Sequence, residues 1–371
     1  LALLGLRRLA LLDQPPVHAA SLTRSRVHDT MNHKTSRLAL VLITYNRAPF
    51  LKKTLDAILA KTSPVRDCPL TILDNHSTDG SGDVIRAFIA THTNIRHVIH
   101  PFNVGGNANI AKALECCQTP YHWILCDDDV YDWTHWTAVE EAMSRGERLL
   151  CVGDRHLPPA SVPQRNDSAQ LLQQMTFLPS IIYGPGAITD TALRNAYDYT
   201  YALFPHLAPV IMHLNAGGRI WVSPHAIVRP GEYGTDISYS RGFQESQIFP
   251  IGRTMTLAAG FAYLTDCLTD RRLAKRAFAT LVFGSQMGRI GFYGEIFARL
   301  RGRAGEANFH AILRQSPWIT RSALRLLRLV QNSPLYTLVM NPRIYSSVRR
   351  LADWRNRRVR LANHSRISPH A

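Results

Sequence analysis

Apolar and polar positions alternate along the first third of the chain in blocks of two kinds. Short aliphatic runs of about five to eight residues are typical of strands buried on both faces of a parallel sheet. Such runs cover residues 37–44, 70–75, 95–100 and 122–129. Apolar residues at helical spacing fill the stretches between them, at residues 48–62, 79–92 and 108–117. Strands and helices that alternate with short links predict right-handed βαβ units and a parallel sheet.

The pattern loosens after residue 130. It predicts a strand with a turn at 176–188, a helix at 206–218 and two short strands at 219–228. From about residue 254 the spacing predicts helices to the end of the chain. We therefore expect an α/β body with a helical extension, divided into residues 1–36, a body at 37–253 with halves 37–130 and 131–253, and a C-terminal region at 254–371.

A polar segment follows each of the first four predicted strands. These segments are "TYNR", "DNHSTDGS", "NVGGN" and "DDD". Ligands of parallel sheets gather beyond the carboxyl ends of the strands, so four polar loops at one edge indicate one site. The third loop contains Asn103 and the glycines Gly105 and Gly106. Because glycine has no side chain, the backbone of this loop can approach a ligand closely.

The fourth segment places three carboxylates side by side, which costs energy unless a cation or a proton offsets the charge. If the strand continues, Asp127 and Asp129 point to one side and Asp128 to the other. Two carboxylates suit Mg²⁺ or Mn²⁺, which take their remaining ligands from a bound phosphate. Asp74, at the end of the second strand, is suited to accept from a nucleobase or a ribose hydroxyl, or to form an Asx-turn.

Four segments in this order resemble the successive motifs of family 2 glycosyltransferases, which have the GT-A fold. They are "VLITYNRAPFLKKTLDAIL", "ILDNHSTDGS", "NVGGNANIAKAL" and "WILCDDDV", and the resemblance extends over about residues 37–225. It implies a Rossmann-like mixed sheet flanked by helices, with a nucleotide-binding half at 37–130 and an acceptor half at 131–253. By that resemblance, the nucleotide-sugar is held by Thr44, Tyr45, Asn46, Asp74, Asn103, Gly105, Gly106, Asp127 and Asp128, and Mg²⁺ or Mn²⁺ by Asp129 and Asp127.

The implied reaction is attack of an acceptor hydroxyl on the anomeric carbon of a nucleotide-sugar, with inversion, and it needs a general base. The family usually supplies an Asp from an "ED" pair upstream of a "G-y-r-i…P" stretch. Here "GGRIWVSP" matches that stretch, but Pro205 and His206 stand where the acidic pair is expected. Neutral imidazole is a competent base near pH 7, so His206 is the candidate base. A structural role for His206 stays open, with the acids Asp154, Glu232, Asp236 and Glu245 as alternative bases.

Two other functions compete with this interpretation. Loss of the acidic pair is also expected of a degenerate relative that binds nucleotide-sugar without catalysis. "DDDV" also satisfies the D-x-D-x-[TV] motif of haloacid-dehalogenase-type phosphohydrolases, although that family normally opens its domain with the motif. The basic tail lacks any nucleic-acid reader motif, so we expect no nucleic-acid partner.

The formal net charge of +16 is concentrated near the C-terminus. Residues 321–371 contain eleven arginines and one acidic residue, interleaved with Leu, Val and Trp at roughly helical spacing. This composition is typical of a helix on an anionic membrane surface, and equally of a solvated basic helix packed on the body. No window of about 18 uncharged apolar residues exists, so no membrane span is expected.

The remaining features concern location. The six cysteines show no zinc-type spacing, which favours a reducing cytoplasm. Residues 1–36 precede the first strand and are expected to be poorly ordered, and residues 1–30 are expected to be dispensable, as in an over-extended reading frame. Together these features predict a cytoplasmic enzyme, peripheral on the inner face of the membrane, that extends a bacterial surface polysaccharide such as O-antigen or capsule on a glycan or lipid-linked glycan acceptor.

Overall fold

The structure is a computed structural model of the whole chain. It describes residues 37–116, 119–153, 168–200, 204–231, 257–283, 292–294, 296–297, 300 and 302–336. The alternative bases Asp154, Glu232, Asp236 and Glu245 lie outside these ranges, as do residues 1–36 and the end of the basic tail from residue 337.

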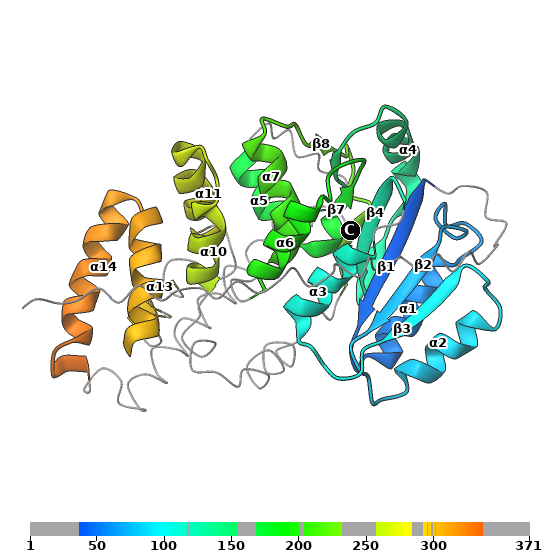
Figure 1. The fold of residues 1–371 in the computed structure, drawn as a ribbon, viewed down its shortest axis with the longest axis horizontal. Helices are drawn as coiled ribbons and strands as arrows, with labels where there is room; N and C mark the ends of the chain where they lie inside the picture. Colours follow the sequence, from blue (N-terminus) through cyan, green and yellow to red (C-terminus); the bar gives the residue numbers. More distant parts are fainter. Residues whose placement is uncertain are drawn as a thin grey trace, which may run out of the picture. The chain divides into compact units, whose positions relative to one another are not determined.

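The first half of the body alternates strands and helices as the hydrophobic pattern predicts (Figure 1). Its elements are β1 (Leu38–Thr44), α1 (Ala48–Ile58), β2 (Leu70–Asp74), α2 (Ser81–Ile89), β3 (Ile95–Ile99), α3 (Gly106–Glu115) and β4 (Tyr121–Cys126). The four strands pair in parallel in the order β3-β2-β1-β4. The predicted parallel sheet is therefore confirmed.

The second half extends this sheet with strands of mixed direction. Its elements are β5 (Asp129–Tyr131), η1 (Trp133–His135), α4 (Trp136–Ser144), β6 (Leu149–Cys151), α5 (Ser168–Met175), η2 (Leu178–Ser180), β7 (Ile181–Tyr183), α6 (Asp190–Asp198), η3 (Pro205–Leu207), α7 (Ala208–Asn215), β8 (Trp221–Val222) and β9 (Val228–Pro230). β7 pairs antiparallel with β4, and β6 and β8 continue the order to seven strands. β5 and β9 form a separate antiparallel pair. The expected mixed sheet is confirmed.

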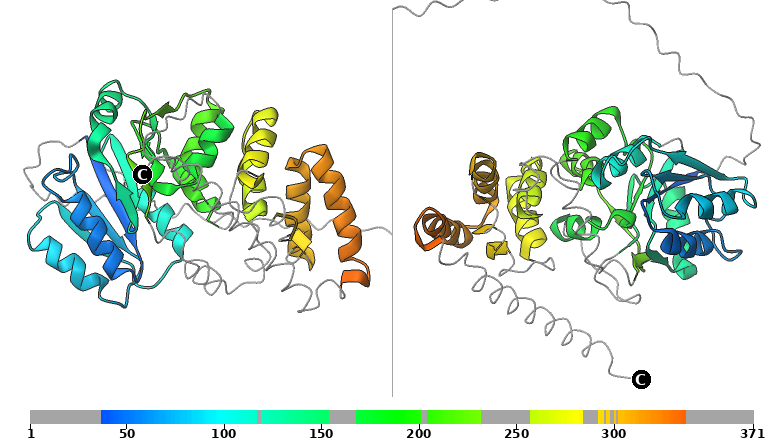
Figure 2. Two further views of the ribbon diagram at one scale, coloured as in Figure 1. Left: turned by 180° about the vertical axis from the view of Figure 1, so that it is seen from behind. Right: turned by 90° about the horizontal axis from the view of Figure 1, so that it is seen from below.

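Alternate side chains of β1 enter two different cores. Leu40 and Leu42 face the layer that contains α1, α2 and α4, while Val41 faces the layer of α3, α5 and α7. A strand buried on both faces needs apolar residues at every position, which explains the continuous aliphatic run in its sequence. Figure 2 shows the sheet between these two helical layers.

The C-terminal region contains α10 (Leu257–Asp266), α11 (Arg271–Phe283), α13 (Gly302–Gln315) and α14 (Trp318–Gln331). The first two of these helices, α10 and α11, complete the second of the two cores. α11 packs against α5, and Leu264 of α10 and Ala277 of α11 belong to the same core as Ile181 of β7. A third core lies among α10, α11, α13 and α14.

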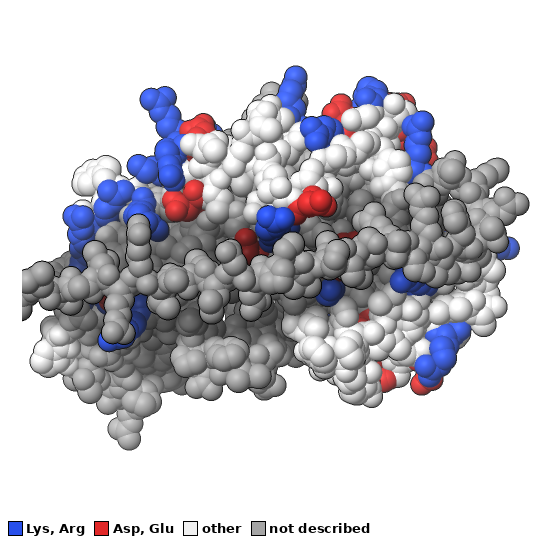
Figure 3. Space-filling view, viewed as in Figure 1, with Lys and Arg blue, Asp and Glu red and all other residues white. Residues whose placement is uncertain are grey.

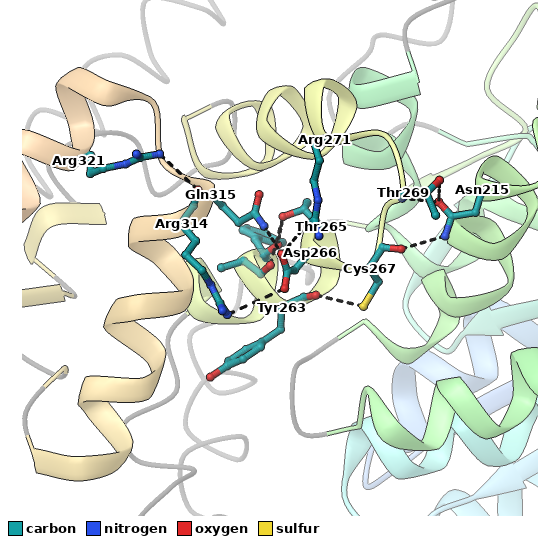
Figure 4. Close-up of polar contacts among 12 residues, drawn as sticks. Asn215, Tyr263, Thr265, Asp266, Cys267, Thr269, Arg271, Arg314, Gln315 and Arg321 are labelled. Carbon is teal, nitrogen blue, oxygen red and sulfur yellow. Dashed lines mark hydrogen bonds and ion pairs between the residues drawn. The ribbon is translucent and has the colours of Figure 1, made fainter.

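Polar contacts join these helices to the body (Figure 4). Asn215, at the end of α7, donates from Nδ2 to the Cys267 carbonyl oxygen at 2.9 Å and accepts from the Thr269 amide at 2.9 Å. Asp266 accepts from Arg271 at 3.0 Å and from Gln315 of α13 at 2.7 Å. The turn between α10 and α11 is thus fixed from both sides. No helix within the described ranges is long and apolar enough to cross a bilayer.

Candidate active site at the carboxyl edge of the sheet

The carboxyl ends of the four parallel strands lie in register. Thr44, the last residue of β1, is opposite Asp74 of β2, and Asp74 is opposite Ile99 of β3. On the other side of β1, Ile43 is opposite Cys126, which ends β4. The loops that follow these strands therefore emerge together, as the sequence predicts.

The three aspartates occupy a turn between two strands. β4 ends at Cys126, Asp127 and Asp128 form the turn, and Asp129 begins β5 opposite Pro230. The amide of Gly231 donates to the Asp128 carbonyl oxygen at 3.1 Å, and a Cβ on Gly231 would collide with that oxygen. A glycine at this position therefore lets the β9 end approach the acidic turn.

Arg47 contacts two of the three carboxylates. Its Nη1 donates to Oδ2 of Asp128 at 2.6 Å and to Oδ1 of Asp127 at 3.3 Å. The expectation that Asp128 points away from Asp127 is wrong, because the chain turns after Cys126 instead of continuing as a strand. Asp127 has two further anchors, since Thr44 Oγ1 donates to its Oδ2 at 2.6 Å and Thr54 Oγ1 donates to its carbonyl oxygen at 2.9 Å.

The charges of Asp127 and Asp129 are poorly compensated. Burial raises the pKa of Asp127 to about 6, although Arg47 and Thr44 act in the opposite direction. Burial, followed by the neighbouring charges of Asp128 and Asp127, raises the pKa of Asp129 well above its usual value. Asp129 is 8% exposed, and its Oδ2 has no hydrogen-bond partner among the described residues. A cation beside these two carboxylates would remove both penalties.

A divalent ion fits this donor set with help from a ligand. No three His, Cys, Asp or Glu side chains in the described parts of the chain converge as a complete metal-binding group. Mg²⁺ and Mn²⁺ usually bind through one or two carboxylates and complete their shell with phosphate oxygens and water. Asp127 and Asp129, the latter with a buried, unpartnered oxygen, are the two carboxylates that could take this part.

Asp74 is held in its ionised form, in contrast to Asp127 and Asp129. Burial alone would raise its pKa, but the neighbouring His97 ring and the hydrogen bonds with Ser77 outweigh burial and lower the pKa. The Ser77 amide donates to Oδ1 at 2.8 Å, and His97 Nε2 lies 3.5 Å from Oδ2. The hydrogen bond with Ser77 corresponds to the Asx-turn that the sequence analysis gave as an alternative role for Asp74. The other carboxylate oxygen, Oδ2, faces His97.

Asn103 and Gly105 shape the loop after β3. Asn103 Oδ1 accepts from Asn75 Nδ2 at 2.8 Å and from the Gly105 amide at 2.8 Å, while Asn75 Oδ1 accepts from the Val104 amide at 2.9 Å. Gly105 has φ +85°, and open space surrounds the Cβ position of both Gly105 and Gly106. Asn75 and Asn103 thus fix a loop whose glycines leave room above the sheet edge.

The loop after β1 is ordered by the loop after β2. Asn46 adopts a left-handed conformation with φ 52°, its amide donates to Ser77 Oγ at 2.9 Å, and its Oδ1 accepts from the Thr78 amide at 2.7 Å. Tyr45 beside it is 42% exposed. Asn46 therefore acts as a brace between the two loops, which leaves the Tyr45 ring accessible to a ligand.

His206 lies in the short η3 helix and is only 2% exposed. Its Nε2 donates to the Met175 carbonyl oxygen at 2.9 Å, and its own carbonyl oxygen accepts from Tyr183 at 2.7 Å. Burial lowers the pKa of His206 to about 4, so the ring is neutral at pH 7. Nδ1 then carries the free lone pair and has no hydrogen-bond partner among the described residues. His206 therefore has the free ring nitrogen that a general base needs, but its side chain is buried in the core.

Two side chains that contact the acidic turn were not identified by the sequence analysis. Arg47 is the last residue of "TYNR", but its pairing with the aspartates depends on the turn at Asp127 and Asp128. Thr54 had a visible signal, because it is a polar residue within the buried stripe of α1 that includes Leu51 and Leu55.

Comparison with known proteins agrees with this geometry. Residues 39–190 match the model of the family described as Glycosyl transferase family 2. The chain is similar to residues 1–349 of TarS from S. aureus, with 14% identity and a TM-score of 0.52 over 80% of this chain and 88% of that one. The structure of the same TarS segment in complex with UDP-GlcNAc gives 13% identity and a TM-score of 0.53 over 86% and 91%. No curated protein sequence matches the chain significantly.

The family match favours the transferase over the phosphohydrolase alternative, because the acidic motif follows the fourth strand of the matched domain instead of opening it. The chain therefore carries a glycosyl transferase family 2 domain with the GT-A fold, the domain of a nucleotide-sugar glycosyltransferase.

Proposed function

We propose that this protein transfers a sugar from a nucleotide-sugar to an acceptor hydroxyl with inversion, and that Mg²⁺ or Mn²⁺ is its cofactor. The observation that carries the proposal is the buried Oδ2 of Asp129, which has no hydrogen-bond partner among the described residues. Asp129 is two residues from Asp127, at the sheet edge where β1 ends at Thr44 and β2 ends at Asp74. A transferase site needs this combination of an ionised carboxylate for the nucleoside and a carboxylate pair for a cation.

The nucleoside is assigned to the edge formed by β1 and β2. Asp74, held ionised by His97 and Ser77, is suited to accept a hydrogen bond from a base N–H or a ribose hydroxyl. Tyr45 supplies an accessible ring for the base. Thr44 links this edge to the acidic turn through its hydrogen bond to Asp127. Asn103 holds the loop in which the backbone of Gly105 and Gly106 would lie close to the nucleotide-sugar.

The diphosphate is assigned to the acidic turn. Asp127 and Asp129 would hold the cation, which when bound offsets the negative charge that develops on the leaving diphosphate. Arg47 is placed to keep its shorter bond to Asp128 while it releases Asp127 to the cation. Asp128 thereby retains a partner and remains available for sugar contacts.

For the acceptor we propose a glycan or lipid-linked glycan of a bacterial surface polysaccharide. This part rests on the basic C-terminal sequence, with eleven arginines in residues 321–371, which is suited to a cytoplasmic enzyme on an anionic membrane face.

The first experiment measures thermal stabilisation by nucleotide-sugars with and without Mn²⁺. The nucleotide-sugars to be tested are UDP-GlcNAc, which is bound in a TarS structure, and GDP-, dTDP- and CDP-sugars. We expect one nucleotide class to stabilise the wild type only with the metal, and Asp129→Ala to lose that response. Asp56→Asn is the matched control, because it removes a half-exposed carboxylate of α1 paired with Lys52. Stabilisation that is equal with and without metal contradicts the proposal.

A second measurement separates a working transferase from a degenerate one. Slow release of nucleotide from the donor sugar, lost in Asp129→Ala and kept in Asp56→Asn, supports catalysis. Metal-dependent binding without any release of nucleotide supports the degenerate relative.

The base is tested with His206→Gln, because a glutamine amide can still donate to the Met175 carbonyl oxygen. If His206 takes the acceptor proton, kcat collapses while the melting temperature holds, and the wild-type profile of kcat against pH inflects well below 6. If His206 only supports the core, kcat is retained, and the base is sought among Asp154, Glu232, Asp236 and Glu245.

A further inference from the structure

The α14 helix carries apolar side chains on two opposite faces. Leu324 is fully buried and enters the C-terminal core, together with the nearly buried Thr320 and Gln331. Large apolar side chains on the other face are exposed to solvent: Trp318 at 75%, Ile319 at 64%, Leu326 at 64% and Leu329 at 69%. Burial explains the apolar residues of the first face, whereas no contact among the described residues explains those of the second.

The exposed side chains form one stripe. At about 100° per residue, Trp318, Ile319, Leu326 and Leu329 fall within a sector of about 100°, opposite Leu324. Ser322 and Arg325 lie within or next to this sector and are exposed too. Scattered exposed apolar residues are normal, but a contiguous stripe on one helix marks an interaction surface. We call these four apolar residues the α14 stripe.

The charge around the stripe has one sign. α14 contains Arg321, Arg325 and Arg328 and no acidic residue. Arg328 is tied to Glu306 and to the Leu300 carbonyl oxygen at 2.6 Å, while Arg325 is exposed beside the stripe. In Figure 3, blue side chains lie over α13 and α14, which contain arginine but no lysine. The sequence after α14 adds eight more arginines against Asp353.

We propose that the α14 stripe docks on a bilayer that contains anionic lipids, with Trp318, Ile319, Leu326 and Leu329 entering the interface and Arg325 contacting headgroups. An apolar face bordered by arginine, and with Trp at one end, is the composition of a helix that lies in the interface plane. The helix is already formed and anchored through Leu324, so binding does not require it to fold.

A second copy of the chain fits this face less well. A symmetric contact between two α14 stripes would bring Arg325 of each copy toward the other, with no acidic residue of α14 to neutralise them. An anionic surface instead offers the opposite charge along the whole helix. The proposal does not depend on the transferase chemistry, because it concerns only where the protein binds.

The test is flotation of the full chain with phosphatidylcholine vesicles, with and without phosphatidylglycerol. We expect wild-type protein to float only with the anionic lipid. Leu326→Gln combined with Leu329→Gln keeps helix propensity and is expected to lower the vesicle partition coefficient at least about tenfold, because two large apolar side chains no longer enter the interface. Ile89→Gln on α2, 37% exposed, is the matched control and should float as wild type.

Three outcomes decide the question. Equal flotation of the double variant and the wild type overturns the proposal and assigns any binding to the charge of the tail alone. A wild type that stays in the soluble fraction on anionic vesicles also overturns it. If light scattering shows a wild-type dimer that the double variant converts to monomer, without flotation of either, the stripe belongs to a second copy. An unchanged melting temperature verifies that the double variant is folded.

Discussion

Asp127 should make the metal-free protein less stable at neutral pH. Its folded-state pKa of about 6 lies above the ordinary value of 3.8, so ionising it in the fold costs more than ionising it in the unfolded chain. The difference corresponds to about 3 kcal/mol at pH 7. The contribution of Asp127 to stability is fully present below pH 3.8 and is lost as the pH rises through 6.

The perturbation is Asp127→Asn, which removes the charge and keeps the shape. Thr44 can still donate to the amide oxygen, but the contact with Arg47 becomes weaker, so we expect a net gain of about 1–3 kcal/mol in the free energy of unfolding at pH 7. Urea denaturation in EDTA measures it. The gain should shrink to near zero at about pH 4, where the wild-type carboxyl is protonated too. With Mn²⁺ present the order should reverse, because only the wild type binds the ion.

Asp74→Asn is the matched control with the opposite sign. The fold lowers the pKa of Asp74, so its charge contributes stability that is present at neutral pH and lost as the pH falls through the lowered folded pKa. The variant should therefore be less stable than wild type at pH 7. A loss of stability in Asp127→Asn at pH 7 in EDTA, or a gain that does not change with pH, would refute the electrostatic reasoning.

Three further changes test other parts of the structure. Mn²⁺ affinity, measured by calorimetry, should fall about tenfold or more from pH 7 to pH 5, since a pKa of about 6 leaves roughly a tenth of Asp127 ionised at pH 5; equal affinities would exclude Asp127 as a ligand. Gly105→Ala should cost about 1–2 kcal/mol at its φ of +85°, whereas Gly106→Ala, with open space and no positive φ, should be nearly neutral; similar losses in urea denaturation would contradict this. Tyr183→Phe should cost about 1–3 kcal/mol in the same assay, because it leaves the buried His206 carbonyl oxygen unpaired; an unchanged midpoint would show that the oxygen finds another donor.

The sequence predicted the parallel half of the sheet because its strands are buried on both faces. A continuous, short aliphatic run such as β1 is typical of a strand covered by helices on both sides. β5 and β6 were missed because each has three residues and exists only through pairing with β9 and β7, far away in the chain. A pattern within one segment cannot report such partners.

The same limit applies to the site. Asp74 and the acidic turn were predicted because strand ends determine where they lie. The orientation of Asp128 was not, because alternation along a strand stops where the chain turns, and the partner Arg47 arrives from the β1 loop. The enclosure of His206 likewise depends on Met175 and Tyr183, which lie on other elements.

The shared core of α10 and α11 has a consequence for synthesis on the ribosome. Leu264, Leu268 and Ala277 complete the apolar core that β7 and α5 share. The Asn215 side chain has its hydrogen-bond partners in the backbone of Cys267 and Thr269, which is synthesised later. A nascent chain that has released only residues up to 253 presents that layer uncovered, which invites chaperone capture or aggregation. The carboxyl edge of the sheet, assembled from residues 38–131, is therefore synthesised first, but it becomes part of a finished fold only after α11 has left the exit tunnel.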